Sequence, residues 1–221
     1  MTRAKLLLTT ALSLALMAGG VNSAQAIDSP KDAREAKAKP VIRGGIVFKA
    51  YCVVCHGEIG NGVARATKLY GSEKLAIRPL GMHEYEKIVR LGGAGVGRSP
   101  YMPPWQEELS EEQISDVLTY LGVVGDQLRR GEVVFKTNCI LCHGIKGNGQ
   151  GRASVLYDPR PSDLTRSDKN DEYKKMIITL GGEAMGRSAV MPPWGLQISE
   201  QEIEDVVAYV KTLQAPAEGG K

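Results

Sequence analysis

Two short segments hold all four cysteines and two of the three histidines of the chain. The first reads CVVCHGEIGNG, from Cys52 to Gly62, and the second reads CILCHGIKGNG, from Cys139 to Gly149. Cysteine sulfur and imidazole nitrogen bind soft and borderline metals, and paired thiols also exchange electrons. The residue types and their spacing therefore make these two segments the candidate functional sites.

Three chemistries use a Cys-X-X-Cys pair. Two such pairs can hold one zinc ion, and a single pair at the start of a helix can act as a redox dithiol. Cys-X-X-Cys-His attaches a haem, with two thioethers to the porphyrin and the next histidine on the iron. A zinc site leaves His56 and His143 without a role, and a dithiol site expects a βαβ pattern that this sequence lacks. Haem attachment explains both segments and both histidines, so the sequence predicts two covalently bound c-type haems.

The predicted haem sites each need a second ligand on the other face of the iron. Met102 and Met191 lie 46 and 48 residues after His56 and His143, each within a Met-Pro-Pro-Trp sequence. Methionine sulfur is a ligand of iron in electron-transfer haems. His83, the third histidine, has no histidine counterpart and is expected at the surface, with a role as competing ligand of the first haem left open. The predicted thioether-forming residues are Cys52, Cys55, Cys139 and Cys142, and the predicted iron ligands are His56, Met102, His143 and Met191.

The elements that must position these residues also occur twice. Matches recur 87 residues apart from Gly44 to Tyr70 and 89 residues apart from Leu91 onward. Each copy predicts a helix leading into the cysteines, a middle helix stopped by Gly-Gly, and a final helix behind a capping box. The ranges are 42–54 and 127–141, then 83–91 and 171–180, then the helices after Ser110 and Ser199. No period-2 pattern appears, so we expect an all-α fold.

The ends of the chain differ in composition from the duplicated part. A 13-residue apolar run, Leu6 to Ala18, follows two cations and precedes Ala-Gln-Ala, which is typical of a secretory signal peptide cut after Ala26. A retained membrane anchor is the alternative. Loss of Arg3 and Lys5 takes the formal net charge from +3 to +1, which gives a nucleic-acid partner no support. We predict a signal peptide (1–26), a lead-in (27–40), domain 1 (41–121), a linker (122–126), domain 2 (127–214) and a tail (215–221).

These motifs resemble the class I cytochrome c family in a dihaem, two-domain, cytochrome c4-like arrangement. The Met-Pro-Pro-Trp loops are also similar to c-type subunits of periplasmic dehydrogenases and reductases. The resemblance implies two tandem domains of a few helices around a covalent haem. It also implies that Gly44 meets the Tyr120 helix and Gly131 the Tyr209 helix. A proline carbonyl would accept the proximal histidine's N–H, from Pro161 for His143 and from Pro79 for His56.

The function that this resemblance implies is single-electron transfer in the periplasm. With both irons six-coordinate, no catalytic residue and no small-molecule substrate are expected. The expected partners are periplasmic redox proteins, with a membrane complex as donor or acceptor. Two alternatives remain: a dihaem enzyme similar to thiosulfate dehydrogenase or peroxidase, and a dedicated subunit of a periplasmic dehydrogenase or reductase.

Overall fold

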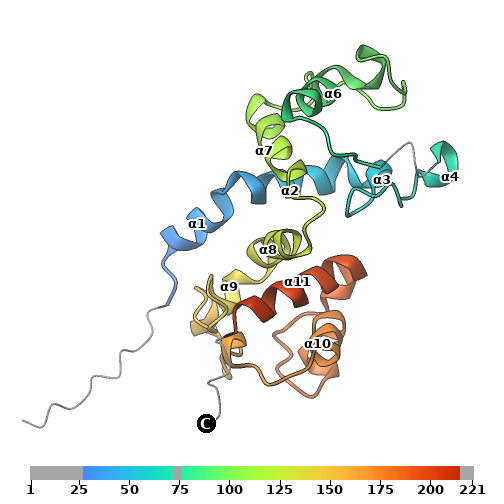
Figure 1. Cartoon of the computed structure of the whole chain (residues 1–221). Helices are drawn as coiled ribbons and strands as arrows, with labels where there is room; N and C mark the ends of the chain where they lie inside the picture. Colours follow the sequence, from blue (N-terminus) through green and yellow to red (C-terminus); the bar gives the residue numbers. More distant parts are fainter. Residues whose placement is uncertain (1–26, 72–75, 215–221) are drawn as a thin grey trace, which may run out of the picture.

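The computed structural model of the chain describes residues 27–71 and 76–214, and these form helices and loops without any strand (Figure 1). The expected all-α fold is confirmed for this part of the chain. Two helical units follow one another along the chain, one above the other in Figure 1. The predicted signal peptide and tail lie outside the described residues. None of the described helices is long and apolar enough to cross a bilayer.

Corresponding helices build the two units in the same order. The lead-in contains α1 (Pro30–Ala38). Domain 1 contains α2 (Pro40–Tyr51), α3 (Val53–His56), α4 (Thr67–Tyr70), α6 (Met82–Gly95) and α7 (Glu111–Leu121). Domain 2 contains α8 (Gln127–Asn138), α9 (Ile140–His143), η1 (Ser154–Leu156), η2 (Leu164–Arg166), α10 (Asp171–Ala184), η3 (Trp194–Leu196) and α11 (Glu200–Thr212).

The helices that lead into the cysteines are shorter than predicted, because each is interrupted at its first cysteine. Cys52 has φ −110° and ψ −32°, which ends α2, and α3 begins at the next residue. Cys139 repeats this break with φ −106° and ψ −28°. The prediction of single helices over 42–54 and 127–141 was therefore wrong. Each cysteine pair instead occupies its own short turn.

The middle helices kink at the Gly-Gly pairs, where the sequence predicted that they stop. Gly92 has φ 68° and Gly181 has φ 81°, a region that favours glycine, and one further helical turn follows each of them. A Cβ at Gly92 would lie 2.7 Å from the carbonyl oxygen of Met102, and one at Gly181 would lie 2.9 Å from that of Met191. Glycine is needed here because the backbone of each candidate methionine passes directly against the kink.

The first and last helices of each domain cross at a glycine, as the resemblance implied. A Cβ at Gly44 would lie 1.9 Å from the carbonyl oxygen of Asp116, and one at Gly131 would lie 2.0 Å from that of Asp205. These crossings bring α2 against α7 and α8 against α11. The predicted capping boxes, Ser110 with Gln113 and Ser199 with Glu202, both form at the starts of the final helices.

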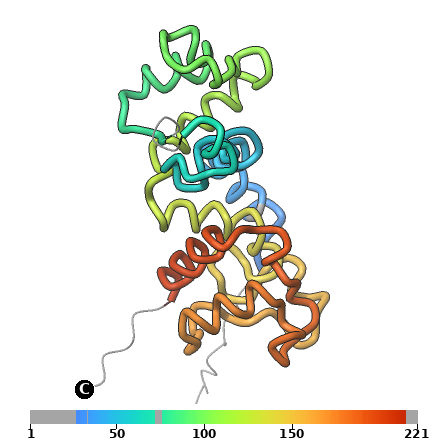
Figure 2. Tube along the Cα trace, turned by 90° about the vertical axis from the view of Figure 1, so that its right-hand side faces the viewer, coloured from blue at the N-terminus to red at the C-terminus, as the bar shows by residue number. Residues whose placement is uncertain are grey.

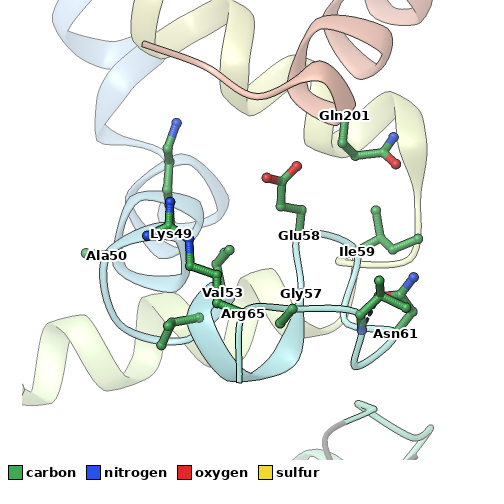
Figure 3. Close-up of a pocket in the computed structure, with 12 residues that line it drawn as sticks. Lys49, Ala50, Val53, Gly57, Glu58, Ile59, Asn61, Arg65 and Gln201 are labelled. Atoms are coloured by element: carbon green, nitrogen blue, oxygen red, sulfur yellow. Dashed lines mark hydrogen bonds between the residues drawn. The ribbon is translucent and has the colours of Figure 1, made fainter. Parts of the chain in front are cut away.

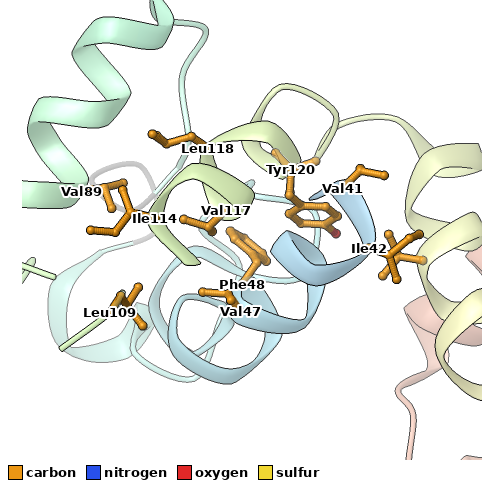
Figure 4. Packing of buried hydrophobic residues seen from close by; sticks show 12 residues of the cluster. Val41, Ile42, Val47, Phe48, Val89, Leu109, Ile114, Val117, Leu118 and Tyr120 are labelled. Atoms are coloured by element: carbon orange, nitrogen blue, oxygen red, sulfur yellow. The ribbon is translucent and has the colours of Figure 1, made fainter. Parts of the chain in front are cut away.

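Aromatic rings fill the core beside each crossing. Phe48 and Tyr120 pack with ring centroids 5.3 Å apart, and Phe135 and Tyr209 pack at 5.5 Å. Figure 4 shows Phe48 and Tyr120 among the buried aliphatic residues of domain 1, including Ile114 and Val117. Burial of such side chains contributes about 1.5–3 kcal/mol each, which makes the helix crossing the main hydrophobic core of each domain.

The two domains meet where α8 lies between α2 and α11 (Figures 1 and 2). Gly45 of α2 faces Val133 of α8, and Val133 is buried within the core cluster of domain 1. Val124 of the linker belongs to that same cluster. The apolar core of domain 1 therefore continues across the linker into the first helix of domain 2.

The lead-in is helical and packs on domain 2, although it precedes domain 1 in the sequence. Ala36 of α1 is 5% exposed and belongs to the core cluster of domain 2. At the start of the lead-in, the Asp28 N–H donates to the carbonyl oxygen of Gln150 (2.9 Å), and the Asp28 carboxylate accepts from the N–H of Ile145. The sequence predicted only a lead-in before domain 1, and the structure shows that this segment packs on the core of domain 2.

Candidate functional site

Each Cys-X-X-Cys-His segment forms one helical turn with the same hydrogen bonds. The His56 N–H donates to the carbonyl oxygen of Cys52 at 2.9 Å, and the Cys55 N–H donates to the same oxygen at 3.2 Å. The corresponding distances to the Cys139 oxygen are 2.9 Å and 3.3 Å. One turn therefore presents two sulfurs and one imidazole side by side in each domain. We call residues 52–56 and 139–143 the CXXCH turns.

A groove in domain 1 brings the CXXCH turn together with Met102. Cys52, Cys55 and His56 line it together with this methionine, and most of its other lining side chains are apolar or aromatic. A flat, largely apolar macrocycle with thioether links and axial nitrogen and sulfur ligands fits such a groove. His83 does not line it. The donor set and the apolar lining therefore fit a covalent haem.

Burial gives the cysteines the opposite character from a reactive dithiol. Desolvation raises the pKa of both Cys52 and Cys139 to about 12, and burial also raises the pKa of Cys142. Catalytic dithiols instead contain a cysteine with a lowered pKa. Within residues 27–71 and 76–214 there is also no group of three or more His, Cys, Asp or Glu side chains placed to hold a metal ion. The raised pKa values of these thiols therefore do not favour the dithiol alternative.

A backbone carbonyl orients the candidate proximal histidine of domain 2. The Nδ1 atom of His143 lies 3.1 Å from the carbonyl oxygen of Ser162. With its proton on Nδ1, the imidazole donates this hydrogen bond and leaves Nε2 for a metal. Burial lowers the pKa of His143 and favours the neutral ring that binds metals. The prediction that Pro161 supplies this carbonyl was wrong by one residue.

The corresponding carbonyl in domain 1 falls outside the described residues. The Ile77 N–H donates to Gly60 and the Leu164 N–H donates to Gly147, so residues 77 and 164 occupy equivalent positions. Ser162 therefore corresponds to Leu75, which belongs to the segment 72–75. Pro79 lies beyond this position, and its proposed contact with His56 stays a prediction.

The two candidate methionines are held by matching backbone hydrogen bonds. The Gly93 N–H donates to the carbonyl oxygen of Met102 (2.9 Å), and the Gly182 N–H donates to that of Met191 (2.8 Å). Both methionine side chains are partly buried. We call residues 96–105 and 185–194 the methionine loops. In both domains the kinked middle helix positions this loop through its glycines.

An ion pair that was not predicted from the sequence ties the first helix to the last in each domain. Arg43 binds Asp116 through two hydrogen bonds of 2.6 and 2.8 Å, and Arg130 binds Asp205 through two of 2.7 and 2.9 Å. The arginines recur 87 residues apart and the aspartates 89 residues apart. The two repeat spacings could have identified these pairs from the sequence.

A second hollow, of about 480 Å³, lies beside the domain interface (Figure 3). Val53 and Val54 line it, whereas Cys52 and Cys55 line the groove, so the two hollows contact different sides of the CXXCH turn. Two of its polar residues contact domain 2: Lys49 donates to Glu202 (2.7 Å), and Glu58 accepts from the Ser199 hydroxyl (2.5 Å). This hollow is part of the interface and has no separate set of reactive groups.

The helical fold and the two CXXCH turns define a two-domain c-type haem protein. Two family models match it in succession. A model described as "Cytochrome C oxidase, cbb3-type, subunit III" matches residues 40–121, and one described as "Cytochrome c" matches residues 128–214. Each half of the chain is a cytochrome c domain, and the two matches together support a dihaem protein of the class I cytochrome c type. Its cofactors are two covalently attached haem c groups.

Curated relatives extend the match across both domains. The chain is 27% identical to a cbb3-type cytochrome c oxidase subunit FixP of Azorhizobium caulinodans, over 77% of this chain and 58% of the relative. It is 25% identical to subunit CcoP of Cereibacter sphaeroides, over 77% and 60%. Subunit FixPc of Rhizobium leguminosarum is 25% identical, over 85% and 64%. The chain thus spans about three fifths of the length of these relatives.

A solved structure also aligns with the chain, but loosely. A chain of the reducing HAO-like protein complex of Kuenenia stuttgartiensis gives a TM-score of 0.36 at 20% identity, covering 78% of this chain and 96% of that one. An alignment of this quality supports no inference about the present protein.

Proposed function

We propose that this protein transfers single electrons between redox partners through two haems, each with one histidine and one methionine ligand. Cys52 and Cys55 would hold the first haem, with His56 and Met102 on its iron. The second haem would be held by Cys139 and Cys142, with His143 and Met191 on its iron. The observation that supports this most is the groove of domain 1, which two cysteines, the histidine and the methionine line together.

The haem supplies the redox-active iron, and the surrounding residues control its environment. Apolar side chains of the groove limit water, and the carbonyl oxygen of Ser162 keeps the His143 ring in one orientation. Methionine ligation raises the reduction potential of a haem. An iron with both axial positions taken by protein has no place for a substrate. We therefore favour an electron carrier over a peroxidase-like or thiosulfate dehydrogenase-like enzyme.

Absorption spectra of the methionine variants test the ligand set. Ferric haem with a methionine ligand has a weak near-infrared band from the iron–sulfur bond. We expect Met102→Ala and Met191→Ala each to remove about half of this band and to open one haem to carbon monoxide, because each removes one of two equivalent ligands. His83→Ala is the matched control and should change neither. Rapid carbon monoxide binding by the unmodified reduced protein would support the enzyme alternative instead.

We further propose that the protein works in the periplasm, with a membrane-bound terminal oxidase of the cbb3 type as electron acceptor or host complex. The relatives named above are subunits of such oxidases, and none of them is a cytochrome c4. The predicted export signal supports the same compartment. The proposed partner therefore fits a dedicated electron-transfer subunit better than the c4-like free carrier.

Fractionation of cells that produce the tagged protein tests the partner. A subunit should co-purify with oxidase activity from solubilised membranes and remain bound at about 0.5 M salt, where surface charge attraction is screened. A freely diffusing carrier should appear in the periplasmic fraction without oxidase. Recovery with the cytoplasmic fraction in haem-free form would contradict both versions.

A further inference from the structure

Domain 1 contains two aromatic pairs in addition to the core pair that both domains share. Tyr70 and Tyr101 have ring centroids 4.4 Å apart, and Tyr51 and Trp105 have centroids 5.5 Å apart with an edge-on geometry. All four side chains line the groove. In each pair one ring belongs to a wall helix, α4 or α2, and the other belongs to the methionine loop. The two pairs therefore join the loop to the walls of the groove on either side of Met102.

Domain 2 lacks one ring of each of these pairs. At the positions of Tyr101 and Tyr51 it has Val190 and Asn138. Asn138 donates instead to the carbonyl oxygen of Val134 within its own helix (2.9 Å). Tyr157 and Trp194 remain, but in the part of domain 2 that the structure describes the only ring pair is the core pair Phe135–Tyr209.

The two loops share backbone anchors to their middle helices, and the rings are one of three differences in how the loops are held. In domain 1 the Trp105 N–H also donates to the carbonyl oxygen of Val89 (3.0 Å), and in domain 2 the Arg187 side chain donates to the Tyr173 hydroxyl (3.1 Å). Beside the glycine contacts described above, the Arg98 N–H donates to the Gly93 carbonyl oxygen (2.7 Å). The Arg187 N–H donates to that of Gly182 (2.8 Å). These bonds fasten both loops to their middle helices. Among the described residues, ring pairs join the loop to the first helix and to α4 only in domain 1, whereas Trp194 of the domain 2 loop packs against the core cluster without a ring pair.

We propose that the pairs Tyr70–Tyr101 and Tyr51–Trp105 hold Met102 on the first haem, and that the second haem exchanges Met191 for an external ligand more readily. This inference rests on the proposed histidine–methionine ligation. Exchange breaks the iron–sulfur bond, forms a bond to the incoming ligand and transfers no electron. The methionine loop must move away for this exchange, and in domain 1 that movement also separates two ring pairs. One aromatic pair is worth about a factor of 2 to 10 in an equilibrium constant, so two pairs should make the haems differ by about 4- to 100-fold, with tenfold as a typical value.

Imidazole titration of the ferric, full-length holoprotein measures this difference. The iron–sulfur band should disappear in two steps of about equal size, about tenfold apart in imidazole concentration. Tyr101→Val and Tyr51→Asn introduce the residues that domain 2 has at these positions. Each should lower the imidazole concentration at which the first haem loses its methionine, toward that of the second haem. Tyr101→Phe keeps the ring and should leave both steps in place. Tyr101 is 64% exposed and Tyr51 is 42% exposed, so these variants should fold, which circular dichroism checks.

The duplicated domain provides the matched control. Tyr157 corresponds to Tyr70 but forms no ring pair among the described residues. Tyr70→Leu should therefore act like Tyr101→Val, whereas Tyr157→Leu should leave both steps unchanged. One step of equal affinity for both haems, or two steps that none of the domain 1 substitutions moves, would overturn the inference. A ferric protein without any iron–sulfur band would instead contradict the ligand set of the proposed function.

Discussion

The two domains contain the same ion pair between their first and last helices, but at different depths. The Arg43 side chain is 35% exposed, and that of Arg130 is 8% exposed. Arg130 also donates to the carbonyl oxygen of Val124 in the linker (2.9 Å), and Gln201 adds a hydrogen bond to Asp205 (3.0 Å). Domain 2 thus buries a contact that domain 1 leaves partly in water, because the linker covers it. The same ion pair is therefore buried to a different extent in each domain, because different residues surround it.

The lead-in extends this asymmetry. Its helix α1 covers part of α8 in domain 2, and α2 of domain 1 covers another part. Domain 2 is therefore contacted by the lead-in, which precedes domain 1 in the sequence, and by the linker, which follows it. The ring pairs at the methionine loop of domain 1 have no counterpart at the methionine loop of domain 2. The structure consequently places the contacts of the lead-in and the linker on domain 2 and the additional ring pairs in the groove of domain 1. Three substitutions or conditions test this comparison.

Removal of the buried arginine should have the largest effect. Arg130→Ala leaves Asp205 buried without its partner, which costs about 3–5 kcal/mol in the free energy of unfolding. Arg43→Ala should cost clearly less, because water can reach Asp116 once the arginine is removed. Denaturant unfolding followed by circular dichroism measures both. Equal losses in the two variants would show that the difference in burial has no energetic consequence.

A charge in the lead-in helix should have an intermediate effect. Ala36→Glu places a carboxylate against the core of domain 2, at a cost of about 2 kcal/mol, and should release α1 from α8. Ala38→Glu is the matched control, because Ala38 is an exposed position of the same helix. Limited proteolysis should cut the first variant within residues 27–40 and spare the control. Equal protection of both variants would mean that the packing of Ala36 does not hold the lead-in.

Acid should have the smallest effect, and the carboxylate of Glu132 in domain 2 should contribute to it. Burial alone would raise the pKa of Glu132, but its hydrogen bond to Lys136 and the charge of Arg129 hold it below the ordinary value of 4.5. A lowered carboxylate pKa stabilises the fold above that ordinary value, and the stabilisation is lost as the pH falls through the folded-state pKa. Domain 1 has Gly45 at the equivalent position.

Thermal unfolding of the wild type and Glu132→Gln between pH 7 and pH 3 tests this expectation. The wild type should lose more stability than the variant across the acid range, and the difference should disappear near the lowest pH. Gly45→Gln is not a usable control, because a Cβ there would lie 2.7 Å from Val133. Lys146→Gln, an exposed substitution in the same domain, serves instead and should retain the wild-type pH dependence. Identical curves for wild type and Glu132→Gln would exclude a contribution from this carboxylate.

Much of the fold could be predicted because local rules decide it. The capping boxes at Ser110 and Ser199 mark the final helices, and the helix-crossing glycines recur with them. The CXXCH turns were evident from spacing alone. The helix break at Cys52 and the kink at Gly92 were not, and the kink depends on a contact with a distant segment of the chain. At Gly92, the contact that requires glycine is the backbone of the methionine loop.

The sequence by itself determined the class of this protein, since the Cys-X-X-Cys-His spacing follows from the chemistry of covalent haem attachment. It also determined the duplication, because equivalent residues keep their order. Only the tertiary structure decided that the lead-in packs on domain 2, that Ser162 orients His143, and that ring pairs cross one groove. These contacts join residues far apart in the chain, and no local pattern of residues specifies which distant surface will cover them.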